Sequence, residues 1–182
     1  GKGQVRSFTY DKLDRVRTVT YDDGFVASYT YDRNGNVGAR TDRAGSWAFT
    51  YDDDNRLTSS AGPGTDDVSY TYDRKGNVTS VTDPVGGTTQ YEYTTVDEGD
   101  LVRDPQGKET TYTYHADHRG WREVVHYPSG VEQRLAFDSS GRVTSIEAYS
   151  PADVQLNNYD YVFTSGGADR AQDLGPRARG RV

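Results

Sequence analysis

A pair of aromatic residues separated by one residue recurs along this chain at a nearly constant interval. The second member of the pair stands at positions 10, 31, 51, 72, 93, 114, 137 and 163, so the intervals are 21, 20, 21, 21, 21, 23 and 26 residues. Self-similarity at a fixed period indicates a repeat architecture and constrains the fold more than any other feature. The repeat-defining tyrosines are Tyr10, Tyr31, Tyr51, Tyr72, Tyr93 and Tyr114.

Each unit has the pattern of a β-hairpin. In Tyr70-Thr71-Tyr72 both rings fall on one face of a strand, whereas residues two apart do not share a helical face. The turn that follows, Asp73-Arg74-Lys75-Gly76, begins with Asp and carries at its fourth position a residue that tolerates positive φ. This pattern predicts a type I turn closed by a G1 bulge. The glycines at the fourth position are Gly35, Gly76 and Gly141.

A second kind of turn joins one unit to the next. Asp83-Pro84-Val85-Gly86 has Pro at i+1 and Gly at i+3, as in a type I turn. We interpret Asp42-Arg43-Ala44-Gly45 as the same turn without proline. Val78 and Val81 are three residues apart, and strict alternation would place them on opposite faces. We therefore expect either a β-bulge or a strand that is buried on both faces.

These observations predict an all-β fold. Residues 1–163 are expected to form seven to eight antiparallel hairpins in tandem, as a continuous curved or spiralling strip. Residues 164–182 are interpreted as an Arg/Gly-rich tail, either a linker or a disordered arm. Val, Leu, Ile and Phe make up only about 16% of the chain, below the ~20% under which charged chains are usually disordered. The 15 tyrosines point instead to a thin ordered strip in which Tyr and Thr replace a deep aliphatic core.

Composition excludes several classes of function. The chain has 21 Lys and Arg against 28 Asp and Glu, a net charge of −7, which argues against a nucleic-acid partner. It has no Cys, so it can form neither a disulfide framework nor a reactive thiolate. No apolar run is long enough to span a bilayer, and no signal peptide opens the chain. No motif requires a cofactor.

The unit closely resembles the YD repeat, also called the RHS repeat. The clearest copy runs from Tyr70 to Gly86 and reads YTYDRKGNVTSVTDPVG. Such repeats occur in bacterial polymorphic toxins, insecticidal toxin complexes, wall-associated proteins and animal teneurins, where the β-strip spirals into a hollow shell that can enclose a toxin domain. The resemblance implies a non-catalytic, structural segment of a secreted or cell-surface bacterial protein. Its implied partners are the remainder of a larger RHS-type chain or the toxin cargo of that chain.

The chain also departs from the family pattern. A family shell takes many hundreds of residues, whereas this chain has 182. The signature that ends the family's core near its cleavage site is absent. We interpret Asp83-Pro84 and Asp104-Pro105 as ordinary turns between units, with no autoproteolytic role.

Two clusters resemble metal sites weakly. His115 and His118 form a His-x-Asp-His sequence, but it falls at the turn of a divergent unit, and a metal site needs three or four converging ligands. Asp52 and Asp54 resemble the start of a calcium loop that lacks its downstream Gly and Glu. A hydrolase built on paired Asp residues or on the two histidines is a third function hypothesis. It is disfavoured because the repeat already explains each Asp as a turn residue.

The aromatic residues offer the alternative function. Rows of Tyr on a sheet either stack on sugars or pack between strands, and we favour packing. Trp47 and Trp121 interrupt the repeat pattern, so they are the candidate carbohydrate-binding residues of a module that binds a glycan or a cell surface. A strip also leaves two unpaired edges, which predicts self-association into dimers or higher oligomers.

Overall fold

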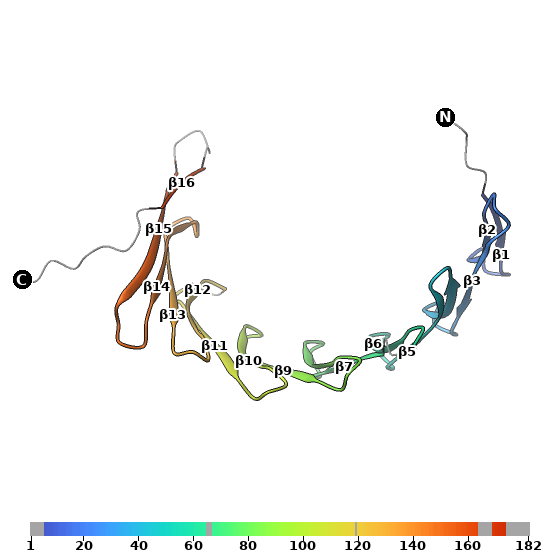
Figure 1. The fold of residues 1–182 in the computed structure, drawn as a ribbon, viewed down its shortest axis with the longest axis horizontal. Coiled ribbons are helices and arrows are strands. Elements are labelled where there is room, and N and C mark those ends of the chain that lie inside the picture. Colours follow the sequence, from blue (N-terminus) through green and yellow to red (C-terminus); the bar gives the residue numbers. More distant parts are fainter. Residues whose placement is uncertain (1–5, 65–66, 119, 164–168, 174–182) are drawn as a thin grey trace, which may run out of the picture. The chain divides into compact units, whose positions relative to one another are not determined.

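In the computed structural model the described residues are 6–64, 67–118, 120–163 and 169–173, and the chain divides into two compact halves, Gly1–Thr89 and Gln90–Val182. In each half the strands follow one another in chain order and pair antiparallel with their neighbours (Figure 1). The all-β fold of tandem hairpins in an open sheet is confirmed. Over the described ranges we find no helix that is long and apolar enough to cross a membrane.

An odd-numbered strand, its turn and the next even-numbered strand make one hairpin unit. The first half holds β1 (Ser7–Tyr10), β2 (Val16–Thr20), β3 (Val26–Tyr31), β4 (Val37–Asp42), β5 (Gly45–Tyr51), β6 (Leu57–Ala61), β7 (Val68–Tyr72) and β8 (Val78–Thr82). The second half holds most of β9 (Thr88–Tyr93), then β10 (Gly99–Arg103), β11 (Glu109–Tyr114), β12 (Arg122–His126), β13 (Glu132–Phe137), β14 (Val143–Tyr149), β15 (Gln155–Phe163) and β16 (Asp169–Asp173).

The second strand of a unit carries one extra residue opposite the aromatic pair. Tyr70 pairs with Val81. Tyr72 pairs with Val78. One residue therefore lies between the two tyrosines, whereas two residues lie between the two valines opposite them. This β-bulge brings both valines to the face that carries the rings, and it explains their three-residue spacing. The same shift occurs in β1–β2, β3–β4, β5–β6, β9–β10, β11–β12 and β13–β14.

The turn within each unit has the predicted geometry. The Gly76 amide donates to the Asp73 carbonyl at 3.2 Å, and the Asp73 amide donates to the Asn77 carbonyl at 2.9 Å. Gly76 has φ +99°, which closes a type I turn with a G1 bulge. Positive φ at the same position occurs in Asp14 (57°), Gly35 (94°), Asn55 (61°) and Gly141 (79°).

The turns between units mostly follow the same design, with one exception. In the Asp83 turn the Gly86 amide donates to the Asp83 carbonyl at 3.0 Å, and the Asp83 amide donates to the Gly87 carbonyl at 2.8 Å. Asp42, however, pairs directly with Gly45, so the four-residue turn expected there lacks the extra residue that follows the Asp83 turn. The hydrogen-bonded ladder between β4 and β5 extends to this pair, so only Arg43 and Ala44 connect the two strands. Gly45 takes φ +134° as a result.

The two faces of the sheet differ in chemistry. On one face the rings lie beside the aliphatic residues of the paired strand. Few of these rings are fully covered, because within the described ranges no second layer packs on the sheet. Among the described residues the buried apolar side chains are Val19, Ala27, Val125 and Tyr149. On the other face hydroxyl groups pair across the strands, as where Thr71 Oγ1 lies 2.7 Å from Ser80 Oγ. The hydrophobic contact is therefore thin and shared between neighbouring units.

The last hairpin crosses the boundary that the sequence suggested at residue 163. Phe163 of β15 pairs with Asp169 of β16, so part of the segment that we interpreted as a tail is a strand. The other residues of that segment, 164–168 and 174–182, lie outside the described residues.

Candidate functional site

Each turn is organised around the carboxylate of its first residue. In the Asp73 turn, Oδ1 accepts the Lys75 amide at 2.8 Å and the Asn77 amide at 2.9 Å. Oδ2 accepts the Asn77 side-chain amide at 3.0 Å. Both oxygens are thus engaged inside the turn. The same arrangement, with Asn or Arg four residues after the Asp, holds for Asp11, Asp32, Asp52 and Asp138.

These hydrogen bonds stabilise the charged form of the carboxylates. The pKa of Asp73 is lowered chiefly because the Asn77 side chain donates to it, with the turn amides adding to the effect. In Asp52 the backbone amide of Arg56 is the main cause of the lowered pKa. A carboxylate that is held ionised and fully hydrogen-bonded is poorly suited to act as a general acid.

Successive units are linked by the second tyrosine of the later unit. Strands β6 and β7, which belong to neighbouring units, pair over only two residue pairs. Beyond these pairs the Tyr72 hydroxyl donates to the Leu57 carbonyl at 2.8 Å, at the bulge of the preceding unit. The equivalent bonds run from Tyr31 to Val16 at 2.8 Å, from Tyr51 to Val37 at 3.1 Å and from Tyr114 to Gly99 at 2.7 Å.

An arginine completes this link where the turn supplies one. The Arg56 guanidinium lies 4.7 Å from the Tyr72 ring centroid, while its Nε donates to Asp52 at 2.7 Å. Its Nη1 also donates to the Asp73 carbonyl of the next unit at 2.9 Å. Arg15 stacks on Tyr31 in the same way, at 4.3 Å. We call this set of three residues a joint. It consists of the first residue of a turn, which we call the turn head, the last residue of the same turn, and the second aromatic residue of the next unit.

The second tyrosines were named from the sequence as repeat-defining residues, but the hydrogen bond that their hydroxyl makes in the joint was not predicted. The first position holds Phe8 and Phe49 as well as tyrosines, whereas the second is Tyr in the first six copies. That difference was the available signal, because only a phenol can donate a hydrogen bond. Burial raises the pKa of Tyr51, with the Asp32 charge adding to it, so the hydroxyl keeps its proton.

One joint is built from different residues. His115 takes the place of the turn-head Asp, since its Nδ1 accepts the Asp117 amide at 3.2 Å and its own amide donates to the Trp121 carbonyl at 2.9 Å. Trp121 therefore stands at the arginine position, after a turn that is two residues longer. Its partner in the next unit is Phe137, with ring centroids 5.2 Å apart. An aromatic stack thus replaces the Asp–Arg–Tyr set.

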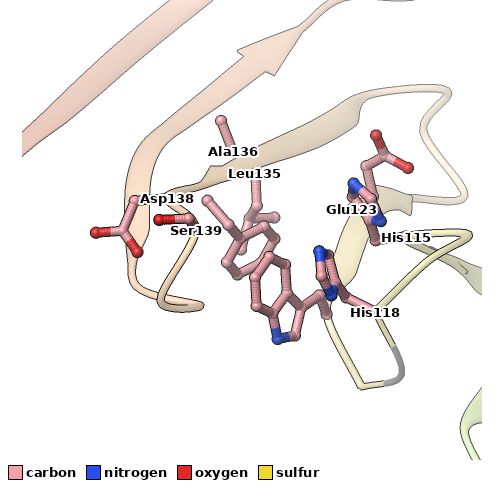
Figure 2. Close-up of a pocket in the computed structure, with 9 residues that line it drawn as sticks. His115, His118, Glu123, Leu135, Ala136, Asp138 and Ser139 are labelled. Carbon is pink, nitrogen blue, oxygen red and sulfur yellow. The ribbon is translucent and has the colours of Figure 1, made fainter.

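An open hollow of about 340 Å³ lies beside this joint. Figure 2 shows it between the turn that carries His115 and His118 and the equivalent turn of the next unit, which starts at Asp138. His118 already stacks on Trp121, with ring centroids 4.1 Å apart. A sugar that stacked on this face of the indole would have to displace His118.

Comparison with known proteins agrees with this architecture. The family model described as Teneurin YD-shell matches residues 4–163. The chain belongs to the teneurin YD-shell family. Membership of a shell family and the repeated joints together support a structural role. No curated protein sequence matches the chain.

Solved structures give the same fold for this YD-shell chain. The TcdB2-TccC3-Cdc42 crystal structure matches with a TM-score of 0.77 and 14% identity, over 97% of this chain and 11% of that chain. TcdB2-TccC3 without its hypervariable C-terminal region matches with a TM-score of 0.76 and 15% identity, over 94% of this chain and 10% of that chain. The Photorhabdus luminescens Tc holotoxin pore with a mutated TccC3 matches with a TM-score of 0.76 and 14% identity, over 97% of this chain and 10% of that chain. The chain therefore spans about a tenth of the solved chains that it matches.

The other site residues chosen from the sequence occupy ordinary positions in the YD-shell fold. Trp47 lies on the ring face of β5, with the Arg40 guanidinium 4.9 Å from its ring. Asp52 is a turn head, and the Asp54 carboxylate lies 3.6 Å from Arg56. In the part of the chain that the structure describes, no three His, Cys, Asp or Glu side chains gather as a metal site would require. The metal and carbohydrate assignments stay predictions.

Acid should weaken the turns of this YD-shell chain. The pKa values of Asp11, Asp32, Asp52, Asp73 and Asp138 are lowered in the folded chain. Their stabilisation is therefore complete above the ordinary value of 3.8 and is lost as the pH falls through the lower folded values. We expect the urea midpoint to fall steeply below about pH 4. In a variant with Asn at all five positions the urea midpoint should depend less steeply on pH. An unchanged pH dependence of the midpoint would show that these carboxylates do not stabilise the turns.

The divergent joint offers a test with a matched control. A Cβ on Gly141 would lie 2.8 Å from Trp121 Cζ2, whereas one on Gly107 would meet nothing within 4 Å, and both glycines have φ +79°. Gly141→Ala should therefore cost about 1 kcal/mol more than Gly107→Ala and shift the Trp emission. Urea unfolding followed by Trp fluorescence measures both effects. Equal costs with unchanged emission would show that Trp121 does not pack as described.

Proposed function

We propose that this chain is a non-catalytic wall segment of a YD-repeat shell that encloses a toxin or effector. The observation that carries the proposal is the joint, in which the turn carboxylate is committed to hydrogen bonds inside its own turn and the tyrosine hydroxyl is committed to the carbonyl of the neighbouring unit. A wall needs such repeated lateral links, whereas an active site needs groups that remain available to a substrate. One of the matched structures is a Tc holotoxin pore, which supports an enclosed toxin as the cargo.

The proposal also names partners and a location. The chain covers about a tenth of the solved shells, so its partners are the remaining repeats of a larger RHS-type chain and the cargo that they surround. We place it in a secreted or cell-surface bacterial protein. Self-association through the sheet edges is the alternative if the segment acts alone.

A segment exchange tests the shell function. This chain would replace the matched segment of the TcdB2-TccC3 fusion chain, followed by electron microscopy and limited proteolysis. We expect closed particles whose enclosed region resists protease. The same exchange with Tyr31, Tyr51, Tyr72 and Tyr114 changed to Ala is the control and should give open, protease-sensitive particles. A wild-type exchange that is soluble and rich in strands but never closes would overturn the proposal.

Carbohydrate binding is the second candidate function. The hollow beside Trp121 favours it, because Glu123 and Ser139 offer polar groups next to aromatic rings, as sugar sites do. Titration of the chain with bacterial polysaccharides should quench Trp emission if the hollow binds sugars. Trp121→Phe should abolish the effect, and Trp47→Phe should leave it intact. Unchanged emission across a glycan panel would remove this candidate.

A further inference from the structure

The turn of the second unit carries the one Asn-Gly sequence of the chain, Asn34-Gly35. Both residues are exposed at the tip of the turn. The backbone nitrogen of the residue that follows an asparagine can attack the side-chain carbonyl carbon of that asparagine, and glycine hinders the attack least because it has no Cβ. The other five asparagines precede Val, Arg, Asn or Tyr. Asn34 is therefore the asparagine of this chain with the least hindered nucleophile.

The hydrogen bond that holds this nucleophile in the turn is long. The Gly35 amide donates to the Asp32 carbonyl at 3.3 Å, whereas the equivalent bonds of the other four Asp-headed turns within units measure 3.0–3.2 Å. An N–H···O bond ordinarily spans about 2.7–3.2 Å, so this amide is the least firmly held of the five. Gly35 has φ +94°, and glycine can rotate away from that conformation without a clash. The Gly35 nitrogen can therefore turn toward the side chain that precedes it.

The Asn34 side chain also links two units. Its Nδ2 donates to Asn55 Oδ1 in the turn of the third unit at 2.8 Å, and Asn36 Nδ2 donates to the same oxygen at 2.8 Å. Asn36 stands where the joints on either side have arginine. The Tyr51 hydroxyl of this joint lies 3.1 Å from the Val37 carbonyl, the longest of the four described tyrosine bonds. The joint between the second and third units therefore depends on side-chain amides more than its neighbours do.

We propose that Asn34 is a deamidation site whose reaction irreversibly loosens the joint between the second and third units. The Gly35 nitrogen bonds to Asn34 Cγ and gives up its proton, the Cγ–Nδ2 bond breaks, and ammonia leaves with that proton. Water then adds to one of the two carbonyl carbons of the succinimide ring and opens it, which leaves aspartate or isoaspartate at position 34. Water is the only other reactant. The joint belongs to the chain itself, so the reaction does not depend on the proposed shell function.

Either product weakens the contact with the third unit. A carboxylate has no N–H to donate, so Asn55 Oδ1 loses one of its two amide donors. The new negative charge also lies beside a turn that contains three consecutive aspartates, residues 52–54, and like charges repel. Isoaspartate in addition lengthens the backbone by one carbon before Gly35, which separates the Gly35 amide from the Asp32 carbonyl. The turn and the joint are weakened together.

The site is tested on the full chain in mildly alkaline buffer, once folded and once unfolded in urea. Peptide mapping by mass spectrometry follows each asparagine, and labelling by protein isoaspartyl methyltransferase reports isoaspartate. In the folded chain Asn34 should react several-fold faster than any other asparagine. Reaction of Asn34 in the unfolded chain but not in the folded chain would show that the turn protects it, and would overturn the inference. Faster reaction of another asparagine in the folded chain would do the same.

Gly35→Asn is the matched control for the nucleophile. The third unit has Asn55 at this turn position with φ 61°, so asparagine fits the turn. An added Cβ at position 35 would meet Arg15 Nη1 at 3.8 Å, an ordinary van der Waals contact. The variant should stay folded, and its Asn34 should react several-fold more slowly. A rate equal to that of the wild type would show that glycine does not govern the reaction, and would overturn the mechanism.

Asn34→Asp measures the effect on the joint. It should lower the urea midpoint at neutral pH, and the deamidated wild-type chain should show a shift in the same direction. Ser140 holds the same turn position in a later unit, so Ser140→Asp adds the same charge to a turn and should leave the midpoint unchanged. Unchanged midpoints for Asn34→Asp and the deamidated chain would overturn the effect on the joint. Equal losses for Asn34→Asp and Ser140→Asp would overturn it as well, since charge on a turn would then suffice.

Discussion

Tyr72→Ala is expected to lower the free energy of unfolding by about 3 kcal/mol. The change removes a half-buried ring, its hydrogen bond to the Leu57 carbonyl at 2.8 Å and its stacking with Arg56. Truncation of a buried aromatic residue costs about 3–5 kcal/mol, and partial exposure reduces that contribution. The hydrogen bond and the cation–π contact each add about 1 kcal/mol or less. Urea unfolding monitored by circular dichroism measures the loss.

The matched control is the same substitution at the exposed end of the strip. Tyr10 is equivalent to Tyr72 in the repeat, but 55% of its side chain is exposed. Tyr10→Ala should therefore cost about 1 kcal/mol or less. Tyr72→Phe should fall between the two, since it keeps the ring and loses only the hydroxyl. Equal losses for Tyr10→Ala and Tyr72→Ala would contradict a role for the joint.

Gly45→Ala should destabilise the chain by about 3 kcal/mol. Gly45 has φ +134°, a region that residues with a Cβ rarely adopt, and an added Cβ would lie 2.7 Å from Pro63 Cγ. Either the β4–β5 turn must open or Pro63 of the next turn must move away. The urea midpoint of the purified chain, compared with that of the wild type, gives the size of the effect.

Gly24→Ala separates backbone strain from steric contact. Gly24 has φ +83°, and a Cβ there would meet nothing within 4 Å. This variant should lose only the cost of a left-handed residue, about 1–2 kcal/mol. If Gly45→Ala were no worse than Gly24→Ala, the packing of successive turns on one another would not contribute to stability.

Local features made the fold predictable from the sequence. The alternation in Tyr70-Thr71-Tyr72 and the positive-φ residue at Gly76 act within a few residues, so the hairpin and its G1 bulge followed directly. The bulge between Val78 and Val81 was one of two alternatives, since spacing alone does not distinguish a bulge from a strand that is buried on both faces. The direct pairing of Asp42 with Gly45 did not follow from the sequence, because it depends on how far the β4–β5 ladder extends.

The joints were less predictable because they connect residues about one unit apart. No short motif links Leu57 to Tyr72, and the bond depends on how the strands of neighbouring units part. Trp121 was read as an interruption of the repeat because its turn is two residues longer. The structure instead shows it at the position of Arg56, stacked on the next unit's Phe137. The placement of His115 at a turn was predicted correctly and is confirmed by its bond to the Asp117 amide.

The most direct test of the joint is a double-mutant cycle between Arg56 and Tyr72. The two residues belong to different units, and the guanidinium lies 4.7 Å from the ring centroid. Urea unfolding of the wild type, Arg56→Ala, Tyr72→Ala and the double variant gives the coupling energy. We expect a favourable coupling of about 1 kcal/mol, so that the double variant is less destabilised than the sum of the two single variants. Losses that add to within about 0.3 kcal/mol would contradict the claim that this joint couples neighbouring hairpins.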